Sequence, residues 1–175
     1  MEPFLTDIRK IRERARTATA DGAVTKAYKA DAEQVVAVLN EALATELVCV
    51  LRYKFHYYMA TGLASEAVKA EFLQHAAEEQ LHADRLAARI VQLNGKPDLN
   101  PDSLTAKSHS EYIEGGDLTS MIKEDLVAER VAIETYTDII HWLGDKDPTT
   151  SRMLKEILEK EEEHAEDLSS LLQSV

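Results

Sequence analysis

Two stretches of this chain carry the same arrangement of acidic residues and histidine. Glu46 opens the segment ELVCVLRY and Glu129 opens the segment ERVAIETY, and each segment ends in a tyrosine. A Glu-x-x-His motif follows each segment, at Glu79–His82 and at Glu161–His164. Helical bundles that hold two metal ions use this set of ligands, one Glu from each of two helices and Glu-x-x-His from each of the others. Carboxylates with some imidazole suit iron or manganese, so the sequence predicts a site for two such ions.

The spacing of these residues predicts that they meet at one level of a bundle. Glu46 and Glu79 lie 16 and 17 residues from Gly62, and Glu129 and Glu161 lie about 16 residues from a second turn near residues 144–145. Every residue of a helix adds the same rise, so residues equidistant from a hairpin turn reach the same height. Each histidine follows its glutamate by three residues and shares its helix face. One motif could be a surface pair on an acidic helix, but two matched motifs indicate a metal site.

The helices that must position these residues can be read from apolar periodicity and turn residues. We expect a short helix at about 3–18 and long helices at about 31–60, 65–93, 117–144 and 148–172. Residues 95–116 are expected to form a long loop. About 20 extended residues span roughly 65 Å, whereas a helix of about 28 residues is roughly 42 Å long. The fold class predicted is therefore all-α, a four-helix bundle with one long crossover and an extra short N-terminal helix.

Composition predicts a soluble domain that attracts cations. The formal net charge is −12, yet residues 1–30 hold seven basic residues against four acidic ones. We expect residues 1–30 to be a basic extension and residues 31–175 to be the bundle. The single cysteine, Cys49, excludes an internal disulfide and a four-cysteine metal site, which fits a reducing, cytoplasmic location. No secretory signal or membrane-spanning run is recognised, so no membrane partner is expected.

Two tyrosines lie seven residues after the isolated glutamates of the repeat. Tyr53 follows Glu46 and Tyr136 follows Glu129, two helical turns along the same face. An ordinary buried tyrosine with a satisfied hydroxyl is one interpretation. The other is a hydrogen-bond donor to a metal-binding carboxylate, or a donor of one electron to an oxidised centre.

The remaining histidines lack the repeated pattern. His56, His109 and His141 are interpreted as surface or core residues. His75 lies one turn before Glu79 and could offer an additional metal contact, although we expect it to be exposed.

The chain resembles the bacterioferritins and the related ferritin-like and Dps-like (DNA protection during starvation) iron proteins. The similarity covers about residues 31–170 and is clearest at Glu46-Leu-Val…Tyr53, at Glu79-x-x-His82-Ala-Asp-Arg-Leu, and at Glu-Ile-Leu-x-x-Glu-x-x-His164. It implies a ferritin-like bundle with a di-iron ferroxidase centre, at which O₂ or H₂O₂ oxidises Fe(II), and storage of ferric oxide in a symmetric cage. The implied ligands are Glu46 and His82 for one iron, Glu129 and His164 for the other, and Glu79 and Glu161 as bridges.

Three departures from bacterioferritin refine this expectation. Gln80 stands where bacterioferritins place the methionine that binds haem, so no haem is expected there. The sequence ends eleven residues after His164, which favours a 12-subunit, Dps-like cage over a 24-subunit one. The basic segment at residues 1–30 could bind DNA, as Dps tails often do, but packing on the bundle or on a neighbouring subunit is favoured.

Two further functions remain open. A di-iron or di-manganese enzyme that removes peroxide, of rubrerythrin or manganese-catalase type, would keep the site without the cage. A DNA-compacting protein would use the basic extension, and the metal site would be secondary.

Overall fold

A computed structural model of the 175-residue chain describes residues 7–20, 22–62 and 65–174. Within these ranges the regular structure is helical and contains no strand, which confirms the all-α prediction. The helices are α1 (Ile8–Thr17), α2 (Ala32–Met59), α3 (Ser65–Gln92), α4 (Pro101–Lys107), α5 (Leu118–Leu143) and α6 (Pro148–Leu172). The expected start of the first helix at residue 3 lies outside the described residues.

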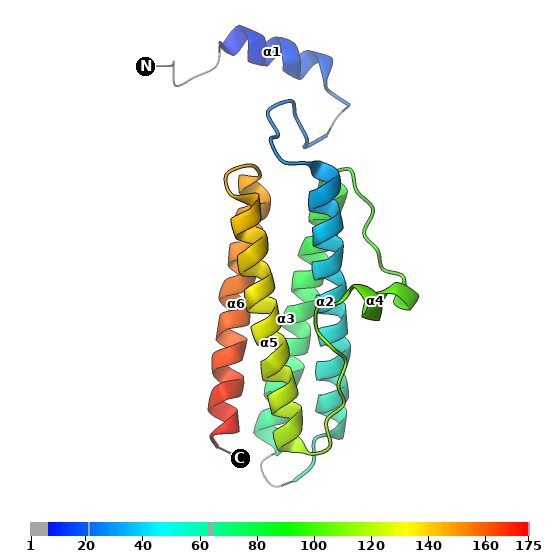
Figure 1. Ribbon diagram of the computed structural model, residues 1–175, viewed down its shortest axis with the longest axis vertical. Helices are drawn as coiled ribbons and strands as arrows, with labels where there is room; N and C mark the ends of the chain where they lie inside the picture. The colour runs from blue at the N-terminus through cyan, green and yellow to red at the C-terminus, as the bar shows by residue number, and fades with distance from the viewer. Residues whose placement is uncertain (1–6, 21, 63–64, 175) are drawn as a thin grey trace.

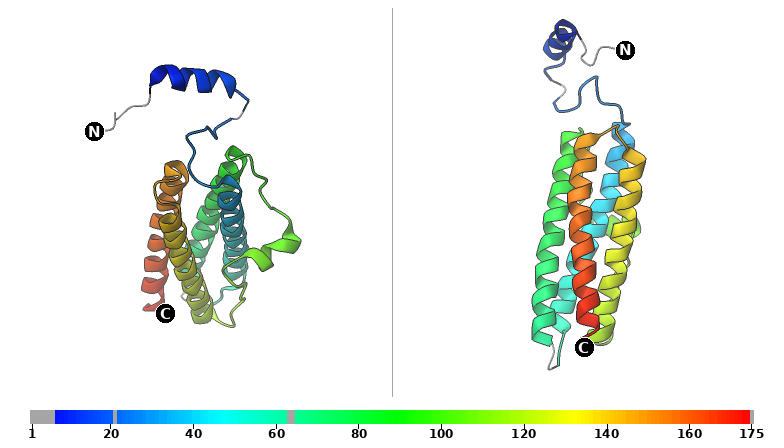
Figure 2. Two further views of the ribbon diagram at one scale, coloured as in Figure 1. Left: turned by 45° about the horizontal axis from the view of Figure 1, so that its top comes forward. Right: turned by 90° about the vertical axis from the view of Figure 1, so that its left-hand side faces the viewer.

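The four long helices α2, α3, α5 and α6 lie side by side and form the bundle (Figure 1). α2 packs along α3, α5 packs along α6, and further contacts join α2 to α5 and α3 to α6. Residues 93–117 run back along the bundle from the end of α3 to the start of α5 (Figures 1 and 2). The predicted single crossover is therefore present, and it makes α5 parallel to α3.

The crossover contains a short helix, so the prediction of a plain loop over residues 95–116 is wrong at α4. The side chain of Asn100 accepts a hydrogen bond from the backbone N–H of Asp102 and caps the helix. Pro101 occupies the first turn, where the missing N–H has no helical partner to lose. α4 packs against α2, which fixes the middle of the crossover to the bundle.

Aspartate caps begin three of the four long helices. Asp31 caps α2 by accepting from the N–H groups of Glu33 and Gln34. Asp117 caps α5 in a capping box with Ser120, and Asp147 caps α6. These caps satisfy N–H groups that lack partners in the first turn, so they define where each helix starts.

Two apolar clusters fill the bundle, one on each side of its middle. One cluster includes Leu39, Leu86 and Leu154, and the other includes Phe72 and Ile122. Along each long helix the residues of the two clusters flank the glutamates of the repeat. The core therefore encloses a polar layer at mid-height and separates it from solvent at both ends of the bundle.

The helix α1 stands beyond one end of the bundle (Figure 2). None of its residues is buried. The basic segment is expected to pack on the bundle or on a neighbouring subunit, and α1 does not pack on the bundle of its own chain. The segment after α1 does reach the bundle, because Val24 and Tyr28 pack against the core and the Tyr28 hydroxyl donates to Asp147 Oδ2 at 2.8 Å.

Among the described residues, α2 alone has the length and apolar composition that could cross a bilayer. Over half of its most apolar window, 56%, is buried inside the bundle. Its apolar side chains are therefore explained by the protein core, and the helix also carries buried Glu46 and Arg52.

Candidate metal centre

The structure brings the six residues of the repeated pattern together in the polar layer. Each of the four long helices contributes, and every one of the six residues is at most 4% exposed. The residues are Glu46 from α2, Glu79 and His82 from α3, Glu129 from α5, and Glu161 and His164 from α6. Glu46 and Glu161, which are 115 residues apart in the sequence, thus share one enclosed volume.

The donor atoms form two groups that overlap at two carboxylates. Glu46, Glu79, His82 and Glu161 form one group, and Glu79, Glu129, Glu161 and His164 form the other. Within each group the donor atoms lie within 4.8 Å of one another. Glu79 and Glu161 belong to both groups, as bridging ligands between two ions would.

The imidazole nitrogens face these carboxylates. His82 Nδ1 lies 2.9 Å from Glu161 Oε1, 3.2 Å from Glu79 Oε2 and 3.5 Å from Glu46 Oε2. His164 Nδ1 lies 3.4 Å from Glu79 Oε1 and 3.7 Å from Glu129 Oε2. In both His82 and His164, Nδ1 is therefore the ring nitrogen that faces the middle of the polar layer.

Several of these atoms are buried without a hydrogen-bond partner, which fits a bound cation. They are Glu46 Oε2, Glu79 Oε1, Glu161 Oε1 and His164 Nδ1, and the approach of His82 to Glu161 lacks hydrogen-bond geometry. Buried polar atoms are normally paired, and buried charge is paired or bound to a metal. Four carboxylates with two neutral imidazoles balance two divalent cations, so the donor set fits iron or manganese.

Without metal, the site holds protons instead. Burial, together with the charge of Glu79, raises the pKa of both Glu46 and Glu161 well above the usual range. Burial opposes protonation of the histidines, but the negative charges of the carboxylates close to both rings dominate. They raise the pKa of His82 to about 10 and that of His164 to about 11. A metal ion must displace these protons to bind.

The two tyrosines orient the isolated glutamates reciprocally across the bundle. The Tyr53 hydroxyl on α2 donates to Glu129 Oε1 on α5, and the Tyr136 hydroxyl on α5 donates to Glu46 Oε1 on α2. The second oxygen of each glutamate remains directed at the metal groups. Burial raises the pKa of both tyrosines well above the usual value, so the hydroxyls stay protonated and act as donors.

One contact that sequence reasoning missed orients His164. Its Nε2 lies 2.6 Å from Glu78 Oε2 on α3, so Nε2–H donates to Glu78 and Nδ1 is left as the ligand atom. In the second Glu-x-x-His motif the residue that corresponds to Glu78 is Lys160, whose ammonium pairs with Glu163. The two halves of the duplicated pattern therefore differ beside the histidines.

The prediction that His75 is exposed is wrong. The residue is fully buried, and its ring stacks on that of His164 with the centroids 4.0 Å apart. Its Nδ1 lies 3.2 Å from the Tyr53 hydroxyl. Helical spacing placed His75 one turn from Glu79, but only the packing of α6 on α3 buries it.

A buried ion network next to the centre was also missed. Asp125 on α5 accepts from Arg52 Nε at 2.8 Å and lies 2.8 Å from His56 Nδ1. Arg52 also donates to the backbone carbonyl of Glu111, and His56 contacts that of Ile113. The network joins α2 to α5 and to the end of the crossover.

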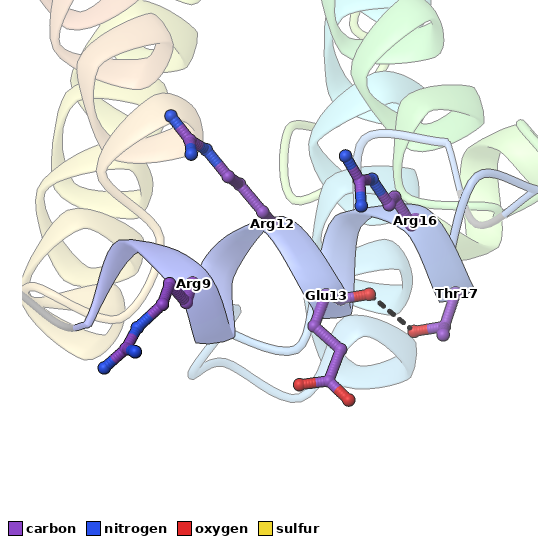
Figure 3. Close-up of a pocket in the computed structure, with 5 residues that line it drawn as sticks. All are labelled: Arg9, Arg12, Glu13, Arg16 and Thr17. Atoms are coloured by element: carbon purple, nitrogen blue, oxygen red, sulfur yellow. Dashed lines mark hydrogen bonds between the residues drawn. The ribbon is translucent and has the colours of Figure 1, made fainter.

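A second polar feature lies on α1, away from the metal centre. Arg9, Arg12 and Arg16 line a shallow hollow with Glu13 and Thr17. Figure 3 shows Arg12 and Arg16 projecting from one side of the helix, while Arg9 and Glu13 point elsewhere. α1 contains five basic residues and one acidic residue, so it is a strongly cationic exposed helix.

Comparison with known proteins identifies relatives of this chain. The ferritin-like domain family matches residues 36–175, which include most of α2 and all of α3, α5 and α6 up to its end. A DNA protection during starvation protein of Pyrococcus furiosus is 31% identical over 137 residues, covering 77% of this chain and 74% of that protein. A bacterioferritin of Desulfovibrio desulfuricans is 26% identical over 132 residues, covering 75% of this chain and 70% of that protein.

A similar solved structure is that of the bacterioferritin-related protein of Bacteroides fragilis, described as a dodecameric thioferritin. It matches with a TM-score of 0.80 and 33% sequence identity, and covers 83% of this chain and 88% of that one. The likeness therefore extends over the bundle that contains the candidate metal centre.

Proposed function

We propose that this chain, which belongs to the ferritin-like domain family, oxidises Fe(II) to Fe(III) at the buried centre of its bundle and stores the product. The observation that carries the proposal is the pair of overlapping donor groups that share Glu79 and Glu161. Iron bound there supplies the electrons that O₂ or H₂O₂ accepts. Manganese, which prefers similar ligands, is the alternative metal.

The protein's contribution is to hold and orient the ligands. Glu46 and His82 would bind one ion, Glu129 and His164 the other. Tyr53 and Tyr136 fix the rotation of the isolated glutamates by donating to one oxygen of each. The apolar clusters on both sides keep bulk water from the layer, which strengthens the attraction between the carboxylates and the cations.

Rapid mixing of the apo-protein with Fe(II) in the presence of oxygen tests this assignment. Absorbance of ferric product should rise quickly in the parent protein. We expect Glu79→Ala with His164→Ala to slow the initial rate by at least roughly tenfold, because one bridging ligand and one terminal ligand are lost. Glu162→Ala, an exposed change on α6, is the matched control and should keep the parent rate. A double variant as fast as the parent would refute the assigned centre.

Storage requires an assembly, and we propose a homo-oligomeric cage, with twelve subunits favoured. The dodecameric description of the Bacteroides fragilis relative supports this proposal. Large apolar side chains available for subunit contacts also support it, including Tyr58 at 76% and Leu51 at 54% exposure. Light scattering of the native protein should give a mass near twelve chains. A dimer would leave no storage cavity and would favour a peroxide-removing di-metal enzyme instead.

DNA binding is a second candidate function, favoured by the exposed cationic helix α1. Such binding would be electrostatic and would weaken steeply as salt increases. A gel shift at low salt should be lost when Arg9, Arg12 and Arg16 are changed to Gln in the full chain. An unchanged shift would exclude α1 as the DNA contact. Both functions are proposed to operate in the cytoplasm, where the lone Cys49 stays reduced.

A further inference from the structure

His75 has a second ring nitrogen that faces away from the metal centre and has no hydrogen-bond partner. Its Nε2 is buried, and the whole residue is 0% exposed. Two carboxylate oxygens lie on that side, Glu71 Oε2 from α3 and Asp167 Oδ2 from α6, each 3.8 Å away. These distances are too long for hydrogen bonds. A buried nitrogen is thus directed into an acidic pair without being bonded to it.

The hydrogen bonds on the inner side of the ring determine its tautomer. The Tyr53 hydroxyl gives its hydrogen to Glu129, so its oxygen can only accept from His75 Nδ1–H. A neutral imidazole that carries its proton on Nδ1 has a bare lone pair on Nε2. Nε2, Glu71 and Asp167 are then three acceptors with no donor among them.

We propose that His75 Nε2, Glu71 and Asp167 form a third site that binds a divalent transition-metal ion, adjacent to the two overlapping groups of the centre, since His75 also lies within reach of Glu129 and His164. The three donor atoms lie within 4.8 Å of one another. Metal–nitrogen and metal–oxygen bonds are about 2.0–2.2 Å long for ions such as zinc. Small rotations of the carboxylates, whose side chains are 36% and 53% exposed, allow all three contacts. One nitrogen and two carboxylates suit Fe²⁺ or Mn²⁺ and leave positions for water.

The place of this third site indicates what it does, and this step rests on the proposed iron oxidation. The His75 ring stacks on His164, whose Nδ1 belongs to the inner groups. Glu71 and Asp167 reach solvent along the seam between α3 and α6. The third site therefore lies between the protein surface and the centre, where it would receive Fe²⁺ before transfer inward.

Crystals soaked in Mn²⁺ test the site directly, because anomalous scattering locates the ion. In the parent protein we expect a manganese peak bonded to His75 Nε2, in addition to two peaks at the centre. Glu71→Gln with Asp167→Asn should abolish the outer peak and retain the inner two. Both residues are at least partly exposed, so this variant should fold. Glu162→Gln, another exposed change on α6, is the matched control and should retain all three peaks.

A second variant separates this inference from the proposed function. Glu79→Gln with Glu161→Gln should remove the inner manganese ions and leave the outer ion in place. Inner peaks without an outer peak in the parent would overturn the third site and leave the ferroxidase proposal standing. An outer peak without inner peaks in the parent would overturn the ferroxidase proposal and leave the third site standing.

Kinetics then test the role in transfer. With the Glu71→Gln, Asp167→Asn variant, the Fe²⁺ concentration that gives half the maximal oxidation rate should rise by roughly tenfold, while the maximal rate changes little. An unchanged concentration dependence would refute the transfer role.

Discussion

Individual hydrogen bonds decide which atoms of the centre are available to a metal. Tyr53 and Tyr136 each occupy one oxygen of a glutamate on the opposite helix, and Glu78 occupies the outer nitrogen of His164. In each case the remaining donor atom faces the middle of the layer. The orientation of the ligands is therefore present before any metal binds, which reduces the reorganisation that binding requires.

Removing one tyrosine hydroxyl tests this orientation. In Tyr136→Phe, Glu46 loses its hydrogen bond and can rotate, so we expect metal affinity at the centre to fall roughly tenfold. Calorimetric titration with Mn²⁺ measures the change. Tyr58→Phe, at a residue 76% exposed, is the control and should bind like the parent. Equal affinity in Tyr136→Phe would show that the hydroxyl does not position Glu46.

Metal binding should release protons and strengthen as pH rises. The pKa of His82, about 10, and that of His164, about 11, keep both rings protonated near pH 7 in the metal-free protein. A metal ion binds only the neutral ring, so binding must expel these protons. Calorimetry in buffers of different ionisation enthalpy should therefore report proton release. Uptake of protons, or no exchange, would contradict the described environment of the histidines.

The same pKa values affect the stability of the metal-free fold. Unfolded histidine has a pKa of about 6.5, so both histidines hold protons more tightly in the folded state. The stabilisation that these two histidines add to the free energy of unfolding is fully present below about pH 6.5 and is lost as pH rises through about 10 to 11. Added metal should offset this alkaline loss.

Residue positions on a helix could be predicted from sequence, but contacts between helices could not. The repeated spacing was enough to name the six residues that meet at mid-bundle. Burial of His75 and the contact of Glu78 with His164 depend on how α6 rotates against α3. The network around Asp125 likewise needs α2, α5 and the crossover together. Neither arrangement leaves a periodic signal in one segment.

At the scale of elements, local chemistry predicted the helix boundaries well. Asp147 with Pro148 and Asp117 with Ser120 are capping signals that act within one turn, so sequence alone reveals them. α4 was missed because its seven residues lie in a stretch rich in turn formers. There Asn100 and Pro101 predict either a turn or a helix start, and packing against α2 selects the helix.

A close approach between α2 and the end of α3 gives a prediction at this scale. A Cβ added at Gly95 would lie 2.6 Å from both γ-carbons of Val36. β-Branched side chains have little freedom to move aside, so Gly95→Ala should destabilise the fold by about 1–3 kcal/mol. Denaturant unfolding measures the loss.

Two companion variants make this prediction specific. Gly116→Ala adds the same methyl group where nothing lies within 4 Å, and it should be nearly neutral. Val36→Ala in the Gly95→Ala background should recover part of the lost stability, because the clash is removed. A Gly95→Ala protein as stable as the parent would contradict the packing of α2 against this turn.

At the scale of the whole molecule, charge is divided between two regions. The chain has a net charge of −12, whereas α1 carries five basic residues against one acidic residue. The acidic bundle would attract Fe²⁺ and the cationic helix would attract polyanions.

The overall topology followed from the sequence because length limits the options. Two helical hairpins, each made of two helices of similar length, and one connection long enough to traverse the bundle permit few topologies. The placement of α1 did not follow, since packing on the bundle or on a neighbouring subunit is the expectation and the single chain buries none of the residues of α1.

The central claim is that the polar layer binds two ions that share Glu79 and Glu161. A crystal soaked with Fe²⁺ under anaerobic conditions, measured at the iron absorption edge, tests it most directly. We predict two anomalous peaks at mid-bundle, one contacting Glu46 and His82 and the other Glu129 and His164, with both glutamates of the shared pair bonded to each. No iron among these six side chains would contradict the account.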